Sequence, residues 1–239
     1  DLGFIFTDTP RSYIYLQILL KKRIYPNYIL YLQNSNNKKI PEINKKNKYT
    51  YNTPKEFKKY FGSKVKIKIN PIDEIKKFNI NYDIYKSTNI HNKNIIKKIL
   101  SRNEKTFIYS GYSGVILKKS ILNTKKNFLH VHGGYLPKFK GSTTNYFSIL
   151  EENTIGASAI FMNEKIDDGP ILFRSKFNLP KKKIEIDFFY DSLIRAIVLF
   201  KTLKLYSREK KWPKASKTNS KFKNYYIIHP LLKHIAILK

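Results

Sequence analysis

Apolar residues at the start of the chain occur in short blocks separated by one helical pattern. Residues 2–9 (LGFIFTDT) are rich in apolar and aromatic residues, which is typical of a buried strand, and 10–12 are expected to form a turn and a possible helix cap. Within 13–22 the apolar positions fall on one helical face, and 28–32 (YILYL) reads as a second strand. A strand, a helix and a strand in this order favour a parallel α/β sheet with helices on both faces.

The following third of the chain is more polar. Residues 33–53 are rich in Asn and Lys and are expected to form a solvated excursion without an element. Further on, periodicity predicts helices over 54–61, 72–78 and 90–100, an edge strand over 65–69, and a short irregular or helical connection over 115–122.

The second half of the chain begins with a predicted central strand at 106–109 (TFIY), which ends in the small-residue loop 110–114. That loop lacks the glycine spacing of a dinucleotide-binding fingerprint. Further elements are predicted as strands over 128–131, 155–162 and 171–177, the last two as a hairpin, and helices over 144–152 and 187–206. The sequence thus predicts one α/β domain over 1–206, with a Rossmann-like, mainly parallel sheet, and a C-terminal extension over 207–239 that packs on it.

Composition supports a folded protein and limits its chemistry. The 239 residues are 41% hydrophobic and 15% aromatic, too apolar for a disordered chain. Cysteine is absent from the sequence, so neither disulfides nor thiolate catalysis nor thiolate metal ligands are available. No apolar run approaches the length of about 18 residues needed to span a bilayer, and no signal segment is recognisable. We therefore expect a cytoplasmic protein without a membrane partner.

The formal net charge of +30 would ordinarily suggest a polyanionic partner. The excess is mostly Lys, spread along the whole chain with Asn and Ile, which is the pattern of a compositional bias. A nucleic-acid surface more often gathers Arg and Lys on one element, interleaved with aromatic residues. We therefore expect general attraction to anionic small molecules, and nucleic-acid binding remains the competing class.

Two histidines at spacing two mark the candidate site. If 128–131 form a strand, His130 and His132 lie on the same face at its carboxyl end, just before two glycines end the run. Asp167 follows in a tight turn (IDDGPIL), and its neighbour Asp168 is interpreted as a turn residue. Paired imidazoles near a carboxylate suit proton transfer and stabilisation of a developing charge. A zinc site with Asp167 as third ligand is the alternative.

The segment HVHGGYLPKFKG, followed by IDDGPIL, resembles the folate-dependent formyltransferases. In that family the pattern is Asn-x-His, a Leu-Pro pair, a basic segment that ends in Gly, and Asp-x-Gly further on. The resemblance covers 107–177 well and extends more loosely to the opening strands and the long helix. It implies that His132 and Asp167 are the catalytic His and Asp, while His130 stands where the family has Asn.

The resemblance also implies a mechanism and a co-substrate. An amine attacks the formyl carbon of 10-formyltetrahydrofolate, His130 and His132 stabilise the oxyanion, Asp167 orients His132 and handles the amine proton, and no metal is required. Because His130 replaces an Asn amide, its imidazole would have to donate the equivalent hydrogen bond. The residues matching the pteridine-binding positions are Ser113, Gly114 and Ile116, with Ile166 and Asp167 on the other side of the pocket.

The acceptor is the least constrained part of the prediction. The tRNA-acting members of the family carry a further C-terminal barrel, whereas YYIIHPLLKHIAI is similar to the tails of formyltransferases of bacterial surface-carbohydrate synthesis. This favours an amino sugar, carried on a nucleotide, as substrate. Thr9, Arg11, Lys138 and Lys140 are the candidate substrate contacts, with the lysine pair otherwise solvated. A tRNA-acting relative and a weakened protein that only binds folate remain the alternatives.

Overall fold

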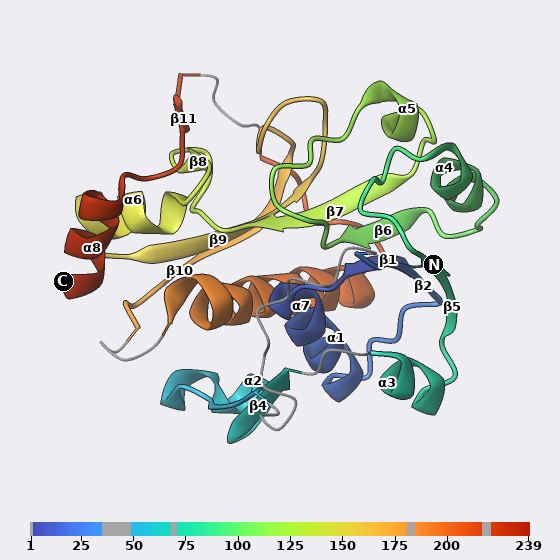
Figure 1. Ribbon diagram of the computed structural model, residues 1–239, viewed down its shortest axis with the longest axis horizontal. Helices are drawn as coiled ribbons and strands as arrows, with labels where there is room; N and C mark the ends of the chain where they lie inside the picture. Colours follow the sequence, from blue (N-terminus) through green and yellow to red (C-terminus); the bar gives the residue numbers. More distant parts are fainter. Residues whose placement is uncertain (1, 35–48, 68–70, 181–184, 217–220) are drawn as a thin grey trace. The chain divides into compact units, whose positions relative to one another are not determined.

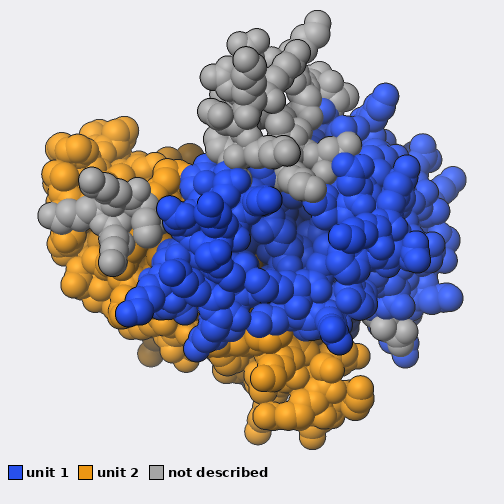
Figure 2. All heavy atoms as spheres, turned by 90° about the horizontal axis from the view of Figure 1, so that it is seen from below, with its two compact units in different colours: residues 1–128 blue, residues 129–239 orange. Residues whose placement is uncertain are grey.

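The computed structural model describes residues 2–34, 49–67, 71–180, 185–216 and 221–239. The chain divides into two compact units, Asp1–Phe128 and Leu129–Lys239, which Figure 2 colours separately. We describe each unit by itself. Of the sequence predictions, parts of those for 33–53, 65–69 and 207–239 fall on residues outside the described ranges.

The first unit is built on four parallel strands in the order β6-β1-β2-β5. Phe4, Ile5 and Phe6 of β1 are fully buried, as is expected for a central strand of a parallel sheet covered on both faces. Every residue of β2 is buried too. The strands are β1 (Leu2–Thr7), β2 (Tyr28–Leu32), β5 (Asn81–Tyr85) and β6 (Thr106–Tyr109).

Helices of the first unit lie on both sides of these strands, with α1 and α3 on one side and α4 on the other (Figure 1). Helix α1 begins at Pro10, so the turn predicted over 10–12 is wrong: these residues form the first helical turn. Thr9 caps this helix by accepting from the Ser12 amide, and proline suits the first helical position because no partner for its missing N–H is needed there. The helices are α1 (Pro10–Lys21), the 3-10 helix η2 (Lys55–Phe57), α2 (Lys58–Phe61), α3 (Ile72–Lys77), α4 (Lys93–Leu100) and α5 (Lys119–Leu122).

Two strands of the first unit were not predicted from the sequence. Strand β3 (Tyr49–Asn52) lies at the end of the predicted polar excursion and pairs antiparallel with β4 (Lys64–Ile67), so the absence of an element up to residue 53 is wrong. Strand β5 pairs parallel with β2 although its residues are exposed or half-buried. Its sequence NYDIY has no apolar run, because a strand at the edge of the set buries little.

The second unit contains an antiparallel set in the order β10-β9-β7, where β7 (Asn127–His132) starts two residues before the unit does. The hairpin of β9 (Ile155–Phe161) and β10 (Ile171–Phe177) is confirmed. A second small sheet pairs β8 (Lys140–Gly141) in parallel with β11 (Asn224–Tyr225). Such a two-residue pairing between segments far apart in the sequence leaves no periodic signal to predict it.

Helix α7 (Asp191–Glu209) packs against β9 and β10, and α6 (Thr144–Glu152) packs against β9 on the opposite side (Figure 1). Helix α8 (Pro230–Leu238) packs on α6 and is capped by the His229 side chain, which accepts from the Leu231 amide. The long helix was expected from 187, but 186–190 form a π-helix (η3) before it. Trp212 stacks on Tyr206, near the end of α7.

The predicted fold class is confirmed: an α/β protein whose strand pairing is mainly parallel, with helices on both faces. Searching the described residues for a transmembrane segment, we found no helix with the length and apolar character to cross a bilayer.

Candidate active site

His132 ends strand β7, and its ring is 6% exposed. Its Nδ1 lies 3.2 Å from Oδ2 of Asp167, in the loop between β9 and β10, and its Nε2 lies 2.7 Å from the carbonyl oxygen of Phe139. The structure therefore brings together the two residues on which the prediction depends, although they are far apart in the sequence.

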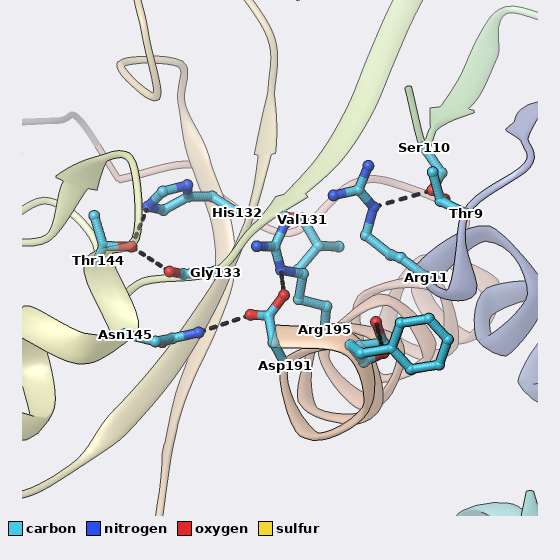
Figure 3. A network of polar contacts seen from close by, with 12 residues as sticks. Thr9, Arg11, Ser110, Val131, His132, Gly133, Thr144, Asn145, Asp191 and Arg195 are labelled. Carbon is cyan, nitrogen blue, oxygen red and sulfur yellow. Dashed lines mark hydrogen bonds and ion pairs between the residues drawn. The ribbon is translucent and has the colours of Figure 1, made fainter. Parts of the chain in front are cut away.

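Both ring nitrogens of His132 face hydrogen-bond acceptors. A neutral imidazole carries one N–H, so one of its nitrogens would point a lone pair at an oxygen. With an N–H at each nitrogen, the ring donates both to the Asp167 carboxylate and to the Phe139 carbonyl. The hydroxyl of Thr144, 3.4 Å from Nε2, donates to the Gly133 carbonyl and so offers this nitrogen a further acceptor (Figure 3). The two ring nitrogens are thus both held by polar groups, Nδ1 by the Asp167 carboxylate and Nε2 by the Phe139 carbonyl.

Asp167 is held by more than the imidazole. Its backbone has φ 47°, in the left-handed region that Asp adopts more readily than most residues, and Oδ2 accepts from the Gly141 amide at 3.1 Å. Burial alone would raise the pKa of Asp167, but the charge and hydrogen bond of His132, the charge of His130 and the Gly141 N–H together hold this pKa well below its ordinary value. Asp167 is accordingly an ionised carboxylate at neutral pH.

Next to His132 and Asp167 the atoms are packed so closely that only glycine fits at position 134. A Cβ on Gly134 would lie 2.6 Å from Nε2 of His132 and 2.4 Å from the Phe139 carbonyl oxygen. The Gly134 position is therefore a requirement of the site: any larger residue would break the bond between His132 and Phe139.

His130 is half-buried and lies two residues before His132 on β7, so the two side chains point to the same side of the strand, as predicted. Asp168, interpreted as a turn residue, accepts from Nζ of Lys140 at 2.6 Å. The prediction that Lys140 is solvated is wrong, because the residue is 7% exposed and its charge is paired with Asp168.

A polar network behind β7 fixes the backbone on both sides of His132. Arg195 of α7 donates to the Val131 carbonyl at 3.3 Å, and its Nε lies 2.7 Å from Oδ2 of Asp191. The other oxygen of Asp191 accepts from Asn145 at 2.7 Å (Figure 3). Because Thr144 holds the Gly133 carbonyl and Arg195 holds that of Val131, the His132 backbone is tethered from two helices.

The candidate substrate contacts of the first unit form a cluster of hydroxyls at the start of α1. The Thr9 hydroxyl is engaged with Ser12 and Thr7, and Arg11 donates from Nε to the Ser110 hydroxyl at 3.1 Å and from its other end to the Gly111 carbonyl (Figure 3). In the second unit, Lys138 pairs with Glu151 and Glu152 at 3.0 and 2.9 Å. Their contact with substrate stays a prediction.

The predicted folate-binding residues lie in exposed loops. Ser113 and Gly114 are exposed, Gly114 has φ 78°, and a Cβ placed on it would meet no atom within 4 Å. Ile116 is 47% exposed in the first unit and Ile166 is 43% exposed beside Asp167 in the second. Apolar side chains left open to solvent suit a planar ring as ligand. Their joint lining of one pocket stays a prediction.

The alternative of a zinc site needs a third ligand in addition to His130 and His132. The described residues contain no group of three or more His, Asp or Glu side chains placed to hold a metal ion.

Several supporting groups were not foreseen. The Phe139 carbonyl and the Gly141 amide act through the backbone, so their side-chain identity carried no signal for them. Thr144 is the first residue of a helix that the sequence predicted. A polar residue at a buried first turn was the signal that could have indicated its role. Arg195 and Asp191 occupy an i,i+4 pair in the apolar helix α7, a pattern that indicates a polar contact on a buried face.

Residues 35–186, more than half of the chain, match the sequence profile of the family described as "Formyl transferase". Among curated proteins, the methionyl-tRNA formyltransferase of Buchnera aphidicola subsp. Acyrthosiphon pisum (strain Tuc7) is 30% identical over 115 residues, which are 48% of this chain and 36% of that protein. The chain thus spans about a third of the length of this relative.

Two solved structures show the same fold. A sugar N-formyltransferase from Shewanella sp. FDAARGOS_354 has a TM-score of 0.57 at 16% identity, over 99% of this chain and 86% of that one. An N-formyltransferase from Helicobacter canadensis, in complex with folinic acid and dTDP-3-aminofucose, has a TM-score of 0.58 at 15% identity, over 95% of this chain and 70% of that one. At such identities the likeness concerns the fold.

Proposed function

Because this chain belongs to the formyl transferase family, we propose that it transfers the formyl group of 10-formyltetrahydrofolate to the amine of an amino sugar carried on a nucleotide. The observation that carries the activity is the buried pair of His132 and Asp167, with the carboxylate held ionised, in the segment that matches the family. The acceptor has weaker support, namely the sugar-acting and nucleotide-sugar-bound proteins that share this fold.

The reaction needs an amine without its extra proton and a stabilised oxyanion. The amine nitrogen attacks the formyl carbon, the bond from that carbon to N10 of folate breaks, and the proton released by the amine ends on N10. Asp167, ionised and beside the histidines, is the group that takes the amine proton, directly or through water. The formyl group and a proton thus change places, with no net change in oxidation.

The hydrogen bonds of the site divide the roles of the two histidines. Nε2 of His132 is bonded to the Phe139 carbonyl and Nδ1 to Asp167, so this ring acts first by orienting Asp167 and keeping it charged. To donate to an oxyanion, Nε2 would have to exchange the Phe139 carbonyl for the substrate. His130, half-buried on the same strand, is the residue we assign to the oxyanion.

We propose the open loop around Ser113 and Gly114, with Ile116, as a folate contact: the backbone at Gly114 can approach a ring closely because no Cβ intervenes, and Ile116 offers an exposed apolar side chain. In the second unit we propose Ile166, exposed beside Asp167, as a further folate contact.

A tRNA acceptor is the second candidate, favoured by the identity with methionyl-tRNA formyltransferases and by the net charge of +30. If the basic surface serves RNA, the affinity for tRNA should fall steeply as salt increases. If the charge is compositional, RNA binding should be weak at physiological salt.

The test uses the purified chain with 10-formyltetrahydrofolate and three sets of acceptors: nucleotide-linked amino sugars with the amine at C3 or C4, free small amines, and methionyl-tRNA. Mass spectrometry of each acceptor should show the gain of one formyl group only for nucleotide-linked sugars. Gain on methionyl-tRNA alone would replace the sugar proposal. Folate binding without transfer to any acceptor would indicate a protein that only binds the cofactor.

A further inference from the structure

The segment that carries the hydrogen-bond partners of the catalytic pair is itself fixed by the C-terminal part of the chain. We propose that Asn224–Ile228, here called the C-terminal strap, is a positioning element of the active site, with Tyr225 as its key residue. This inference rests on the proposed function for its kinetic consequence, but its structural consequence for His132 does not.

The first step concerns what the segment 139–141 does. The Phe139 carbonyl accepts from Nε2 of His132, and the Gly141 amide donates to Oδ2 of Asp167. Between them Nζ of Lys140 is bonded to Asp168. One short segment therefore holds both members of the pair and the neighbouring carboxylate, so a shift of this segment would move all three contacts together.

The second step concerns what holds this segment. The strap pairs with it as β11 with β8, with Asn224 opposite Lys140 and Tyr225 opposite Gly141. The Tyr225 carbonyl accepts from the Ser142 amide at 2.9 Å. Gly141 has φ 103°, and a Cβ at this position would lie 2.1 Å from the Tyr225 carbonyl oxygen. The strap is thus in direct backbone contact with the residue that donates to Asp167.

Side chains fasten the strap on either side of this contact. The Tyr225 ring lies 5.7 Å, centre to centre, from Phe139 and 4.5 Å from Phe147, and its hydroxyl donates to Glu151 at 2.5 Å. Further along, the Thr143 hydroxyl accepts from the Ile228 amide at 2.9 Å and lies 3.3 Å from the Tyr226 carbonyl oxygen.

The C-terminal strap therefore helps to set the geometry of the active site, as the residues of the motif do. Phe139 contacts Tyr225 through its ring and His132 through its carbonyl, so the ring contact fixes the acceptor of Nε2. Loss of the Tyr225 ring should free the segment and weaken the bond from His132 to the Phe139 carbonyl and the bond from the Gly141 amide to Asp167. Misplacement of a catalytic group by about 1 Å can cost up to a hundredfold in rate.

The experiment compares Tyr225→Ala with Tyr225→Phe, which keeps the ring and loses only the bond to Glu151. We expect kcat to fall roughly tenfold in Tyr225→Ala, with KM values for folate and amine nearly unchanged, and to stay near wild type in Tyr225→Phe. Leu231→Ala, in exposed helix α8, removes an equally apolar side chain of the C-terminal segment and should leave kcat unchanged. If Tyr225→Ala fails to fold, Tyr225→Leu replaces it.

The second readout needs no turnover. In ¹⁵N–¹H spectra of the histidine side chains, assigned with His132→Ala, wild type should show a slowly exchanging Nε2 proton on His132, because this N–H is donated to the buried Phe139 carbonyl. In Tyr225→Ala the Nε2 proton should exchange faster and its signal should shift. Unchanged His132 signals in a folded Tyr225→Ala variant would overturn the strap proposal. If the wild-type protein transfers no formyl group, the proposed function is wrong. The spectra would still test whether the strap positions His132.

Discussion

Two polar clusters of this protein, one in each unit, are built from different chemistry. The cluster at the start of α1 consists of Thr7, Thr9, Ser12 and Ser110 with Arg11, and most of its bonds run between hydroxyls or to backbone carbonyls. The cluster at the end of β7 consists of His132, Asp167 and His130, with Nδ1 of His132 3.2 Å from the ionised Asp167 carboxylate. The first cluster is neutral apart from Arg11, and the second, here called the charged cluster, is centred on the Asp167 carboxylate.

The comparison separates structural from catalytic roles. Hydroxyls that cap a helix and bond to a strand end satisfy backbone groups and fix local geometry. A carboxylate whose pKa is strongly lowered stays ionised at neutral pH, where its negative charge can act on groups of the reaction. The sequence assigned Thr9 and Arg11 of the first cluster and all three residues of the second to the site. Substitution can distinguish the clusters: changes in the charged cluster should act on turnover, and changes in the hydroxyl cluster on binding or stability.

The largest effect is expected from Asp167→Asn. The amide keeps the size of the side chain but can take no proton from the amine, so turnover should fall roughly 10³-fold. Steady-state kinetics with an accepted amine measures this. The thermal midpoint and folate affinity serve as controls for folding and for cofactor binding. Turnover within about tenfold of wild type would contradict the role of Asp167 and with it the contrast between the clusters.

The pH dependence of the free energy of unfolding should also report the negative charge of Asp167. Because the pKa of Asp167 is lowered on folding, its contribution to stability is fully present above the unfolded value of about 3.9 and is lost as pH falls through the folded value. The difference in denaturant midpoint between wild type and Asp167→Asn should therefore be largest near neutral pH and should narrow below about pH 4. A difference that is constant with pH would show that the carboxylate is not selectively stabilised in the folded state.

The charged cluster was the more predictable of the two from sequence. Its members stand in a motif with fixed spacing, and the period of a strand places His130 and His132 on one face. What sequence could not give was the set of backbone groups that bind them, such as the Phe139 carbonyl, because any residue can supply a carbonyl. Lys140 was predicted to be solvated because the sequence does not show that its charge is paired with Asp168.

The fold shows the same division. Buried strands such as β2 and β6 were placed to the residue, since continuous apolar runs mark them. The edge strand β5 and the pairing of β8 with β11 were missed, because edge strands bury little and two-residue pairings depend on tertiary contacts alone. The helix α1 was started three residues late because Pro10 was interpreted as a turn residue rather than as the first helical position.

The next largest effect concerns His130→Asn, which restores the residue expected from the family pattern. An Asn amide can donate to the oxyanion without a change of protonation state, so kcat should remain within roughly tenfold of wild type. His130→Ala, which removes the donor, should lose about 10²-fold. Parallel kinetics of the two variants decide between the roles. Equal losses would mean that the imidazole acts through its charge rather than as a donor.

Arg11→Lys tests the cation of the otherwise neutral cluster. Lysine keeps the charge but cannot bond to both the Ser110 hydroxyl and the Gly111 carbonyl, which lead into the loop around Ser113. We expect the KM for folate to increase roughly fivefold, the equivalent of about 1 kcal/mol of hydrogen bonding, with kcat nearly unchanged. Should kcat fall as strongly as in Asp167→Asn, Arg11 would belong to the chemistry and the separation of the clusters would be wrong.

The smallest effect is expected from Thr9→Ala. The hydroxyl of Thr9 caps α1 by accepting from the Ser12 amide at 3.3 Å, and its loss should lower the free energy of unfolding by about 1 kcal/mol. Thr9→Ser keeps the hydroxyl and should keep most of that stability. Chemical denaturation measures both, and kinetics at saturating substrate should be unchanged in both, since the group is predicted to act on the helix and not on the reaction. A raised KM for the amine in Thr9→Ala, absent in Thr9→Ser, would instead give this hydroxyl the substrate contact that sequence predicted for it, and would move one member of the neutral cluster from structure to recognition.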